Sequence, residues 1–187
     1  MRRGFKAEAE RIAVGLREEM GLPDAAPIDP FAVASQMGID VRMADQLVDP
    51  KRLQELRRIQ PDAFSAATFR MPSGRTVVVL NPLSSAGRTK SDLAHELSHL
   101  ILAHELRRIE KVGDLTFFTC DPEQEEEANW LSGCLLLPRP LLLEAAKRGM
   151  KAERLAEQHG VSVTLAKFRL NASGVLIQVG RARRRSR

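Results

Sequence analysis

The residues best suited to chemistry lie in the segment 93–99 (LAHELSH), which contains the pattern His-Glu-x-x-His. If this segment is helical, His95 and His99 lie one turn apart on the same face, because an α-helix has 3.6 residues per turn. Two imidazoles placed in this way can bind one tetrahedral Zn²⁺. Glu96 then lies about 100° round the helix from His95, beside the metal and not on it. Its carboxylate is placed to accept a proton from a metal-bound water.

The surroundings of this motif argue against a chance occurrence. The chain has four histidines, and with so few the motif is expected by chance in roughly one per cent of sequences. The alternative is a pair of ordinary histidines on a core or surface helix. The neighbouring apolar residues, however, would bury the helix and keep the histidines in a dry setting, as a metal site requires. These residues are Leu93, Ala94, Leu97, Leu100 and Ile101.

A catalytic zinc site usually has a third protein ligand and an open position for water. His104 does not fit this role, because it follows His95 by nine residues and would point away, about 180° round the helix. The best source is the acidic segment 123–127 (EQEEE), which begins a second predicted helix. A thiolate from Cys120 or Cys134 is the other possible ligand, and it would complete a closed, structural site.

Within the acidic segment, Glu125 is the residue that we expect to bind the metal. It lies one turn before Ala128, at the edge of a stripe that should be buried, whereas Glu126 and Glu127 should point more toward solvent. The alternative is an acidic first turn that only interacts favourably with the helix dipole. Asn129, one turn after Glu125, is placed to hydrogen-bond a ligating histidine.

The elements that position these residues indicate one α+β domain over residues 1–175. Helices are expected at 5–20, 30–37 and 50–59, for about fifteen residues from Ser91, and at 122–137, 140–158 and 163–171. Strands are expected at 39–43, 64–69, 76–80 and 175–179, and a turn at 71–75 joins the second and third into a hairpin. We predict a small antiparallel sheet packed against several helices, with the histidine motif on a core helix. A helical hairpin follows at 140–174, and residues 176–187 hold the end of the last strand and a basic tail.

Composition limits the class of protein. With 187 residues, 43% of them hydrophobic, the chain can bury a core. We expect no secretory signal and no membrane-spanning segment. The two cysteines are too few for a disulfide framework, so we expect reduced thiols in a cytoplasmic protein. The net charge of +5 comes from the last seven residues, which hold five arginines and no acid, and we expect this tail to be solvated and disordered.

Taken together, the motif segments resemble the ImmA/IrrE family of metallopeptidases. That family pairs an LAHELxH-type helix with a later E-x-E-A-N/D segment that runs into LLxP. The matching stretches here are 93–99 (LAHELSH), 125–129 (EEEAN) and 135–138 (LLLP). Segments 28–30 (IDP), 38–41 (GIDV) and 79–82 (VLNP) are similar to the family's upstream part. The resemblance thus covers most of residues 5–175.

This resemblance implies a gluzincin-like ligand set of His95, His99 and Glu125, with Glu96 as the catalytic base. The metal is expected to be Zn²⁺, with Mn²⁺ as an alternative. The implied substrate is a helix-turn-helix repressor, whose cleavage would release genes of a mobile element or a stress response. Many related enzymes place a Tyr or His beside the developing oxyanion. This chain has no tyrosine, which leaves His159, an arginine or the metal alone.

A different class of function, a DNA-binding regulator with a structural metal, rests on residues 151–171. This segment has the pattern of a helix-turn-helix in which Ser162 caps the second helix, and an arginine-rich tail follows. We prefer an αα-hairpin that closes the peptidase core, because the second helix offers few polar groups to read bases. Direct nucleic-acid binding is therefore not expected. The few polar groups are Thr164, Lys167, Arg169 and Asn171.

Overall fold

The computed structural model describes residues 1–60, 64–105, 108–112, 115–119 and 121–185, with no side chains described over 106–120. The helices are α1 (Phe5–Glu19), α2 (Pro30–Gln36), α3 (Pro50–Ile59), α4 (Ala86–Ile101), α5 (Pro122–Leu136), α6 (Arg139–Lys147), α7 (Ala152–His159), α8 (Val163–Ala172) and α9 (Val175–Arg185), with a short 3-10 turn at Ala44–Gln46. The strands are β1 (Asp40–Met43), β2 (Ala66–Arg70), β3 (Thr76–Leu80), β4 (Arg108–Val112) and β5 (Leu115–Thr119). The α+β class is confirmed.

The first three strands form a mixed sheet in the order β1-β3-β2. The predicted hairpin is confirmed, because β2 and β3 are antiparallel neighbours. The expectation of a purely antiparallel sheet is wrong, because β1 runs parallel to β3. Parallel neighbours need a crossover connection, and here α3 and β2 lie between the two strands in the chain. Strands β4 and β5 form a separate antiparallel pair.

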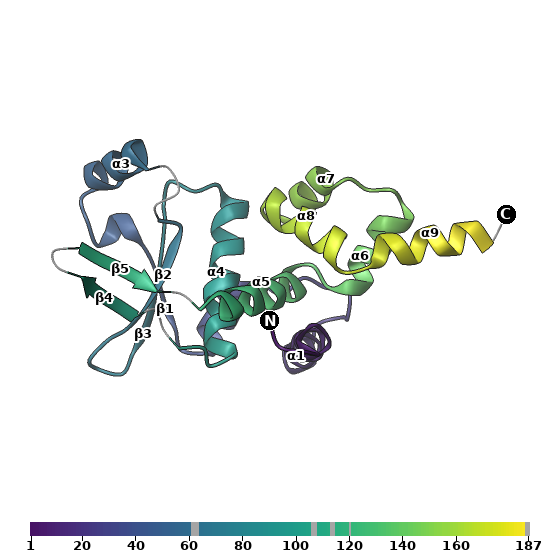
Figure 1. Ribbon diagram of the computed structural model, residues 1–187, viewed down its shortest axis with the longest axis horizontal. Coiled ribbons are helices and arrows are strands. Elements are labelled where there is room, and N and C mark those ends of the chain that lie inside the picture. Colours follow the sequence, from purple (N-terminus) through teal and green to yellow (C-terminus); the bar gives the residue numbers. More distant parts are fainter. Residues whose placement is uncertain (61–63, 106–107, 113–114, 120, 186–187) are drawn as a thin grey trace.

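Helix α4 carries the histidine motif through the middle of the molecule, as predicted. Figure 1 shows it beside α5, between the sheet and the helices α6 to α9. Leu93 and Leu97 are fully buried in a core that also contains Val78 of β3 and Leu131 of α5. Burial of these side chains, at roughly 1.5–3 kcal/mol each, fixes the face of α4 that is left for the histidines.

Helix α4 begins at Ala86, five residues before the predicted start at Ser91. The polar residues of its first turns resemble a loop in sequence, but the Ser85 hydroxyl accepts a hydrogen bond from the Arg88 N–H and caps the helix. At Gly87 the helix touches the turn between α7 and α8, where an added Cβ would lie 2.7 Å from the Val161 carbonyl oxygen. The Ser162 N–H also donates to the Ser91 hydroxyl. These contacts dock the C-terminal helices onto α4.

The C-terminal part differs from the prediction in two places. The helix expected at 140–158 is two helices, α6 and α7, separated by Gly149 in the left-handed region at φ +65°. The strand expected at 175–179 is wrong, because these residues begin α9. Val175 and Val179 are buried while Leu176 and Ile177 between them are exposed, and this spacing follows the period of a helix. The arginine tail is also helical as far as Arg185.

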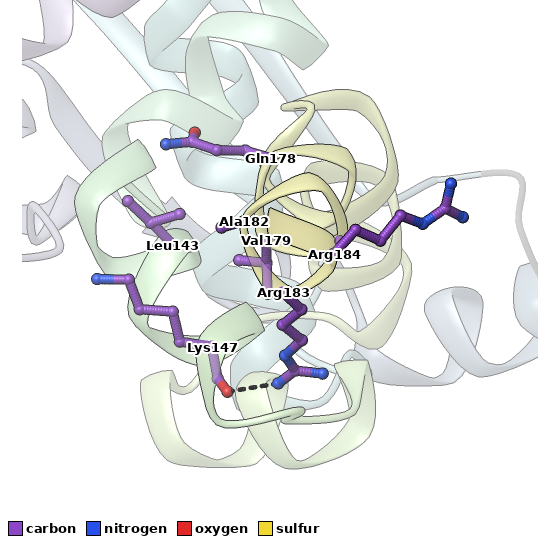
Figure 2. Close-up of a pocket in the computed structure, with 8 residues that line it drawn as sticks. Leu143, Lys147, Gln178, Val179, Ala182, Arg183 and Arg184 are labelled. Atoms are coloured by element: carbon purple, nitrogen blue, oxygen red, sulfur yellow. Dashed lines mark hydrogen bonds between the residues drawn. The ribbon is translucent and has the colours of Figure 1, made fainter. Parts of the chain in front are cut away.

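Helix α9 packs against α6, and a cavity of about 560 Å³ lies along their contact (Figure 2). Leu143 and Val179 form apolar parts of its wall, and Lys147 and Arg183 form a basic part. The Arg183 guanidinium donates to the Lys147 carbonyl oxygen at 2.8 Å, which ties the tail to α6. None of the described helices is long and apolar enough to span a bilayer.

Candidate metal centre

Helices α4 and α5 bring three predicted ligands to one point. The Nε2 atoms of His95 and His99 are 3.1 Å apart. Glu125, from the first turn of α5, places Oε2 3.2 Å from the His95 Nε2 and Oε1 3.6 Å from the His99 Nε2. Within the described part of the chain, these residues form the group of His, Cys, Asp and Glu side chains close enough to hold a metal ion.

The spacing of these atoms fits zinc. Ligand atoms that lie ~2.0–2.1 Å from a tetrahedral Zn²⁺ are about 3.3 Å from one another. The His95 and His99 Nε2 atoms, 3.1 Å apart, and the Glu125 Oε2, 3.2 Å from the His95 Nε2, lie close to that value, while the 3.6 Å contact with the His99 Nε2 is made by the other carboxylate oxygen, Oε1. Two imidazole nitrogens and a carboxylate also match the donor set of catalytic zinc sites, which keep a fourth position for water. The residues therefore fit the metal, and Cys134 takes no part, because its thiol is buried in the core formed by α1, α5 and the sheet.

Contacts at both ends and a buried stripe hold α5, the helix that carries Glu125, in place. The helix is capped at its start, where the Asp121 carboxylate accepts from the Glu123 N–H. At its other end, the buried guanidinium of Arg17 donates to the carbonyl oxygens of Cys134 and Leu135, which are among the carbonyls that a helix leaves without partners. The predicted buried stripe is confirmed, because Ala128, Leu131 and Leu135 are buried.

Glu96, the predicted base, is buried beside the two histidines. Its Oε2 accepts a hydrogen bond from the Thr68 hydroxyl of β2 at 2.6 Å. A charge-assisted bond of this kind fixes one carboxylate oxygen and leaves the other for a second partner. Thr68 was not identified from the sequence. It lies 28 residues from Glu96 on another element, and no local pattern connects the two.

His104 and Glu127 lie on the far side of His99. His104 stands outside the ligand group, as expected, but its Nδ1 lies 3.0 Å from the Nδ1 of His99. Its Nε2 lies 3.3 Å from Glu127 Oε2. The prediction that Glu127 points toward solvent is wrong, because its side chain is 5% exposed. The backbone N–H and the Nε of Arg2 both donate to Glu127 Oε1, and these partners make its burial possible.

The ionisation of Glu127 follows from those contacts. Burial raises the pKa of a carboxyl, but here the hydrogen bonds from Arg2 and His104 outweigh burial and hold the pKa of Glu127 below its ordinary value. The carboxylate is therefore charged at neutral pH. Glu126, the neighbouring residue, has a side chain that is 66% exposed.

A cavity of about 390 Å³ opens beside His95, between α4, α5 and α8. Leu165 and Phe168 of α8 form its apolar wall, and Arg88 and Asp92 of α4 form its charged wall. Burial raises the pKa of Asp92, although the positive charge of Arg88 opposes this shift. The cavity has the mixed lining of a site that holds a small molecule or a side chain.

The other residues considered from the sequence lie at different distances from the candidate metal centre. Asn129 is exposed and lines the cavity beside His95, so its role as a second-layer partner stays a prediction. His159 lines a different cavity, with Leu141 and Leu155 of the C-terminal helices. An arginine was also considered as the group beside the oxyanion, and Arg88 lines the cavity beside His95. Cys120 lies outside the described residues.

The helix-turn-helix pattern forms an αα-hairpin in which two of the four polar residues, Arg169 and Lys167, contact other residues of the chain. Arg169 is fully buried and donates to the Leu137 carbonyl oxygen and to Glu10. Lys167 pairs with Glu153 on α7, and Thr164 lines the cavity beside His95. These positions favour a structural role for the hairpin over a base-reading one.

A helix that carries His-Glu-x-x-His, with a carboxylate supplied by a second helix, defines the class of zinc-peptidase-like metal sites. The model of the IrrE N-terminal-like domain (Peptidase_M78) matches residues 34–171, which is most of the chain. The chain belongs to this family. Membership supports a metallopeptidase or a regulator built on a metallopeptidase fold.

Other comparisons add little to this assignment. A search of curated proteins found no match. A solved structure of a Mycobacterium tuberculosis transcriptional regulator is similar, with a TM-score of 0.49 and 18% identity over 88% of this chain. The chain spans 46% of that structure's length.

Proposed function

We propose that this protein is a zinc-dependent endopeptidase of the cytoplasm, in which His95, His99 and Glu125 hold the metal. The observation that carries the proposal is the convergence of His95, His99 and Glu125 from two helices, with one ligand atom of each residue within 4.8 Å of the others. The buried carboxylate of Glu96 on the same helix supports catalysis, because a purely structural zinc site has no use for a base there.

In the proposed reaction, the metal activates water and the substrate carbonyl, and side chains of the protein transfer the proton and stabilise charge. Zinc at such a site lowers the pKa of water to about 7 and polarises a carbonyl group. Glu96 accepts the proton of the attacking water and returns it to the leaving amine. Thr68 holds the Glu96 Oε2, so that the other carboxylate oxygen is the one that receives the proton. Arg88, in the wall beside His95, is the candidate to stabilise negative charge on the substrate.

We further propose that the substrate is a helix-turn-helix repressor, cleaved to release the genes that it controls. Family membership supports a protein substrate, and the 390 Å³ cavity beside His95 has room for one of its side chains. The alternative, a DNA-binding regulator with a structural metal, is less well supported. Of the four residues that would read bases, Arg169 is buried and Lys167 is paired.

The test compares the zinc-loaded wild type with Glu96→Gln, which keeps the shape of the side chain and removes the base. Both are incubated with a peptide library made from bacterial proteins, and new amino termini are identified by mass spectrometry. We expect cleavage by the wild type and a 10²–10⁴-fold lower rate for Glu96→Gln, with zinc content unchanged. Equal cleavage by the two proteins would contradict the assignment of Glu96.

A further inference from the structure

A line of contacting side chains runs from the candidate metal centre to the exposed Arg2 near the start of the chain. Both ring nitrogens of His99 make contacts: Nε2 lies toward the ligand group, and Nδ1 lies toward His104. His104 in turn contacts Glu127, and Glu127 is held by Arg2. The side chains of His104 and Glu127 are 7% and 5% exposed. Water is therefore largely excluded, and each group depends on the next for its hydrogen bonds.

The backbone after α4 is shaped to make this contact. The helix ends at Ile101, and Ala103 adopts φ +52°. Among the described residues, Ala103 is the one non-glycine residue with a positive φ. The reversal brings the His104 N–H to the His99 carbonyl oxygen at 2.9 Å. A left-handed alanine is strained, and the strain is offset where the surrounding contacts fix the conformation. Here those contacts place the His104 ring against His99.

The order of the contacts sets the tautomer of each ring. Glu127 Oε1 accepts both hydrogen bonds from Arg2, and the other oxygen, Oε2, faces the His104 Nε2. A carboxylate oxygen accepts, so His104 donates from Nε2. In the neutral His104 ring Nδ1 is then the acceptor, and it accepts a hydrogen bond from the Nδ1–H of His99. The Nε2 of His99 then carries no proton, which is the tautomer that binds zinc.

We propose that His104 is a positioning residue, which with Glu127 and Arg2 fixes the tautomer and orientation of His99 for metal binding. The proposal rests on the metal site described above and extends it by a second layer of residues. Two distances support it: His104 Nδ1 lies 3.0 Å from His99 Nδ1, and His104 Nε2 lies 3.3 Å from Glu127 Oε2. It assigns a task to a histidine outside the ligand group and to a buried glutamate on α5.

The first test measures the dissociation constant of zinc by competition with a chelator. His104→Leu removes both hydrogen bonds, whereas His104→Asn keeps an acceptor at the position of Nδ1. We expect His104→Leu to weaken zinc binding 10–100-fold and His104→Asn to recover most of that loss. His159→Leu is the matched control, because His159 lines a separate cavity. Equal zinc affinity of His104→Leu and the wild type would overturn the proposal.

A second variant keeps the test decisive if His104→Leu does not fold. In Glu127→Gln the amide oxygen keeps its bonds from Arg2, so the NH₂ group faces His104 and donates to its Nε2. His104 then carries its proton on Nδ1, and His99 carries its proton on Nε2, the atom that should bind zinc. Zinc affinity should fall at least tenfold, while Glu126→Gln, the same change on the exposed neighbour, leaves it unchanged. Equal affinities of these two variants would overturn the proposal.

Metal-free thermal unfolding separates positioning from simple loss of structure. We expect Glu127→Gln and His104→Asn to unfold within a few degrees of the wild type without zinc, and the cobalt-substituted proteins to differ in visible absorption. A fall in zinc affinity explained fully by a destabilised metal-free protein would overturn the proposal. If Glu125→Ala also leaves zinc affinity unchanged, the failure lies in the metal site itself and in the proposed function.

Discussion

The helix pair α4–α5 and the C-terminal helices α6–α9 differ in the charged groups that they bury. In the pair, buried carboxylates contact other side chains, as Glu96 contacts Thr68 and Glu127 contacts His104. In α6–α9, Arg169 is the buried polar side chain among the described residues, and it donates to the Leu137 carbonyl oxygen and to the Glu10 carboxylate. The rest of that core is aliphatic.

This difference suggests separate roles: α4 and α5 carry the candidate metal site, and α6–α9 support them by packing. A buried polar group lowers stability unless its hydrogen bonds are made, so the buried carboxylates on α4 and α5 support the proposed metal site there. The C-terminal helices contribute packing and, through Leu165 and Phe168, one wall of the cavity beside His95. The comparison predicts that substitutions in the two regions have separable effects.

The largest expected effect on stability lies in the C-terminal region. Leu155 of α7 is fully buried among aliphatic side chains, and Leu155→Ala should lower the free energy of unfolding by about 2–5 kcal/mol. Urea unfolding of the metal-free protein measures this loss. The dissociation constant of zinc should change less than about twofold, since additivity holds for distant sites. A large loss of zinc affinity in the folded variant would break the separation of the two regions.

The next effect lies in the metal site. Glu125→Ala removes a ligand and should weaken zinc binding by more than the 10–100-fold typical of second-layer changes. The metal-free protein should keep its stability, because the Glu125 side chain is only partly buried. Chelator competition and thermal unfolding measure the two quantities. Unchanged zinc affinity would exclude Glu125 and leave a ligand beyond the described residues, such as Cys120.

The smallest effect concerns the orientation of the base. Thr68→Val keeps the size of the side chain and removes the hydroxyl that binds Glu96 Oε2. A hydrogen bond to a charged group contributes ~1.5–3 kcal/mol, so kcat should fall about tenfold or more, with zinc affinity unchanged. Thr76→Val, on the neighbouring strand, is the control. A kcat equal to that of the wild type would show that Glu96 needs no support from β2.

Local signals in the sequence predicted much of the fold. Asp29, Asp49 and Asp121 each precede a proline, and each accepts a hydrogen bond from the N–H two residues later at the start of a helix. Such caps are read from adjacent residues. The strand wrongly predicted at 175–179 shows the limit of this reading, because a short apolar run does not distinguish a strand from a helix.

The candidate site was predictable where its residues share a helix. The spacing of His95 and His99 fixes their common face, and the stripe on α5 favoured Glu125. Glu127 was misjudged because its burial depends on Arg2, 125 residues away in sequence. The contact between Thr68 and Glu96 was missed for the same reason. Partners of this kind are set by tertiary packing, which a single sequence does not display.

The most direct measurement is X-ray absorption at the zinc edge of the loaded wild type and of Glu125→Ala. We predict two imidazole nitrogens together with carboxylate and water oxygens at about 2.0–2.2 Å in the wild type. In the variant, water should replace the carboxylate oxygen or the metal should be lost. A sulfur ligand at about 2.3 Å, or identical spectra for the two proteins, would contradict the convergence of His95, His99 and Glu125 on one ion.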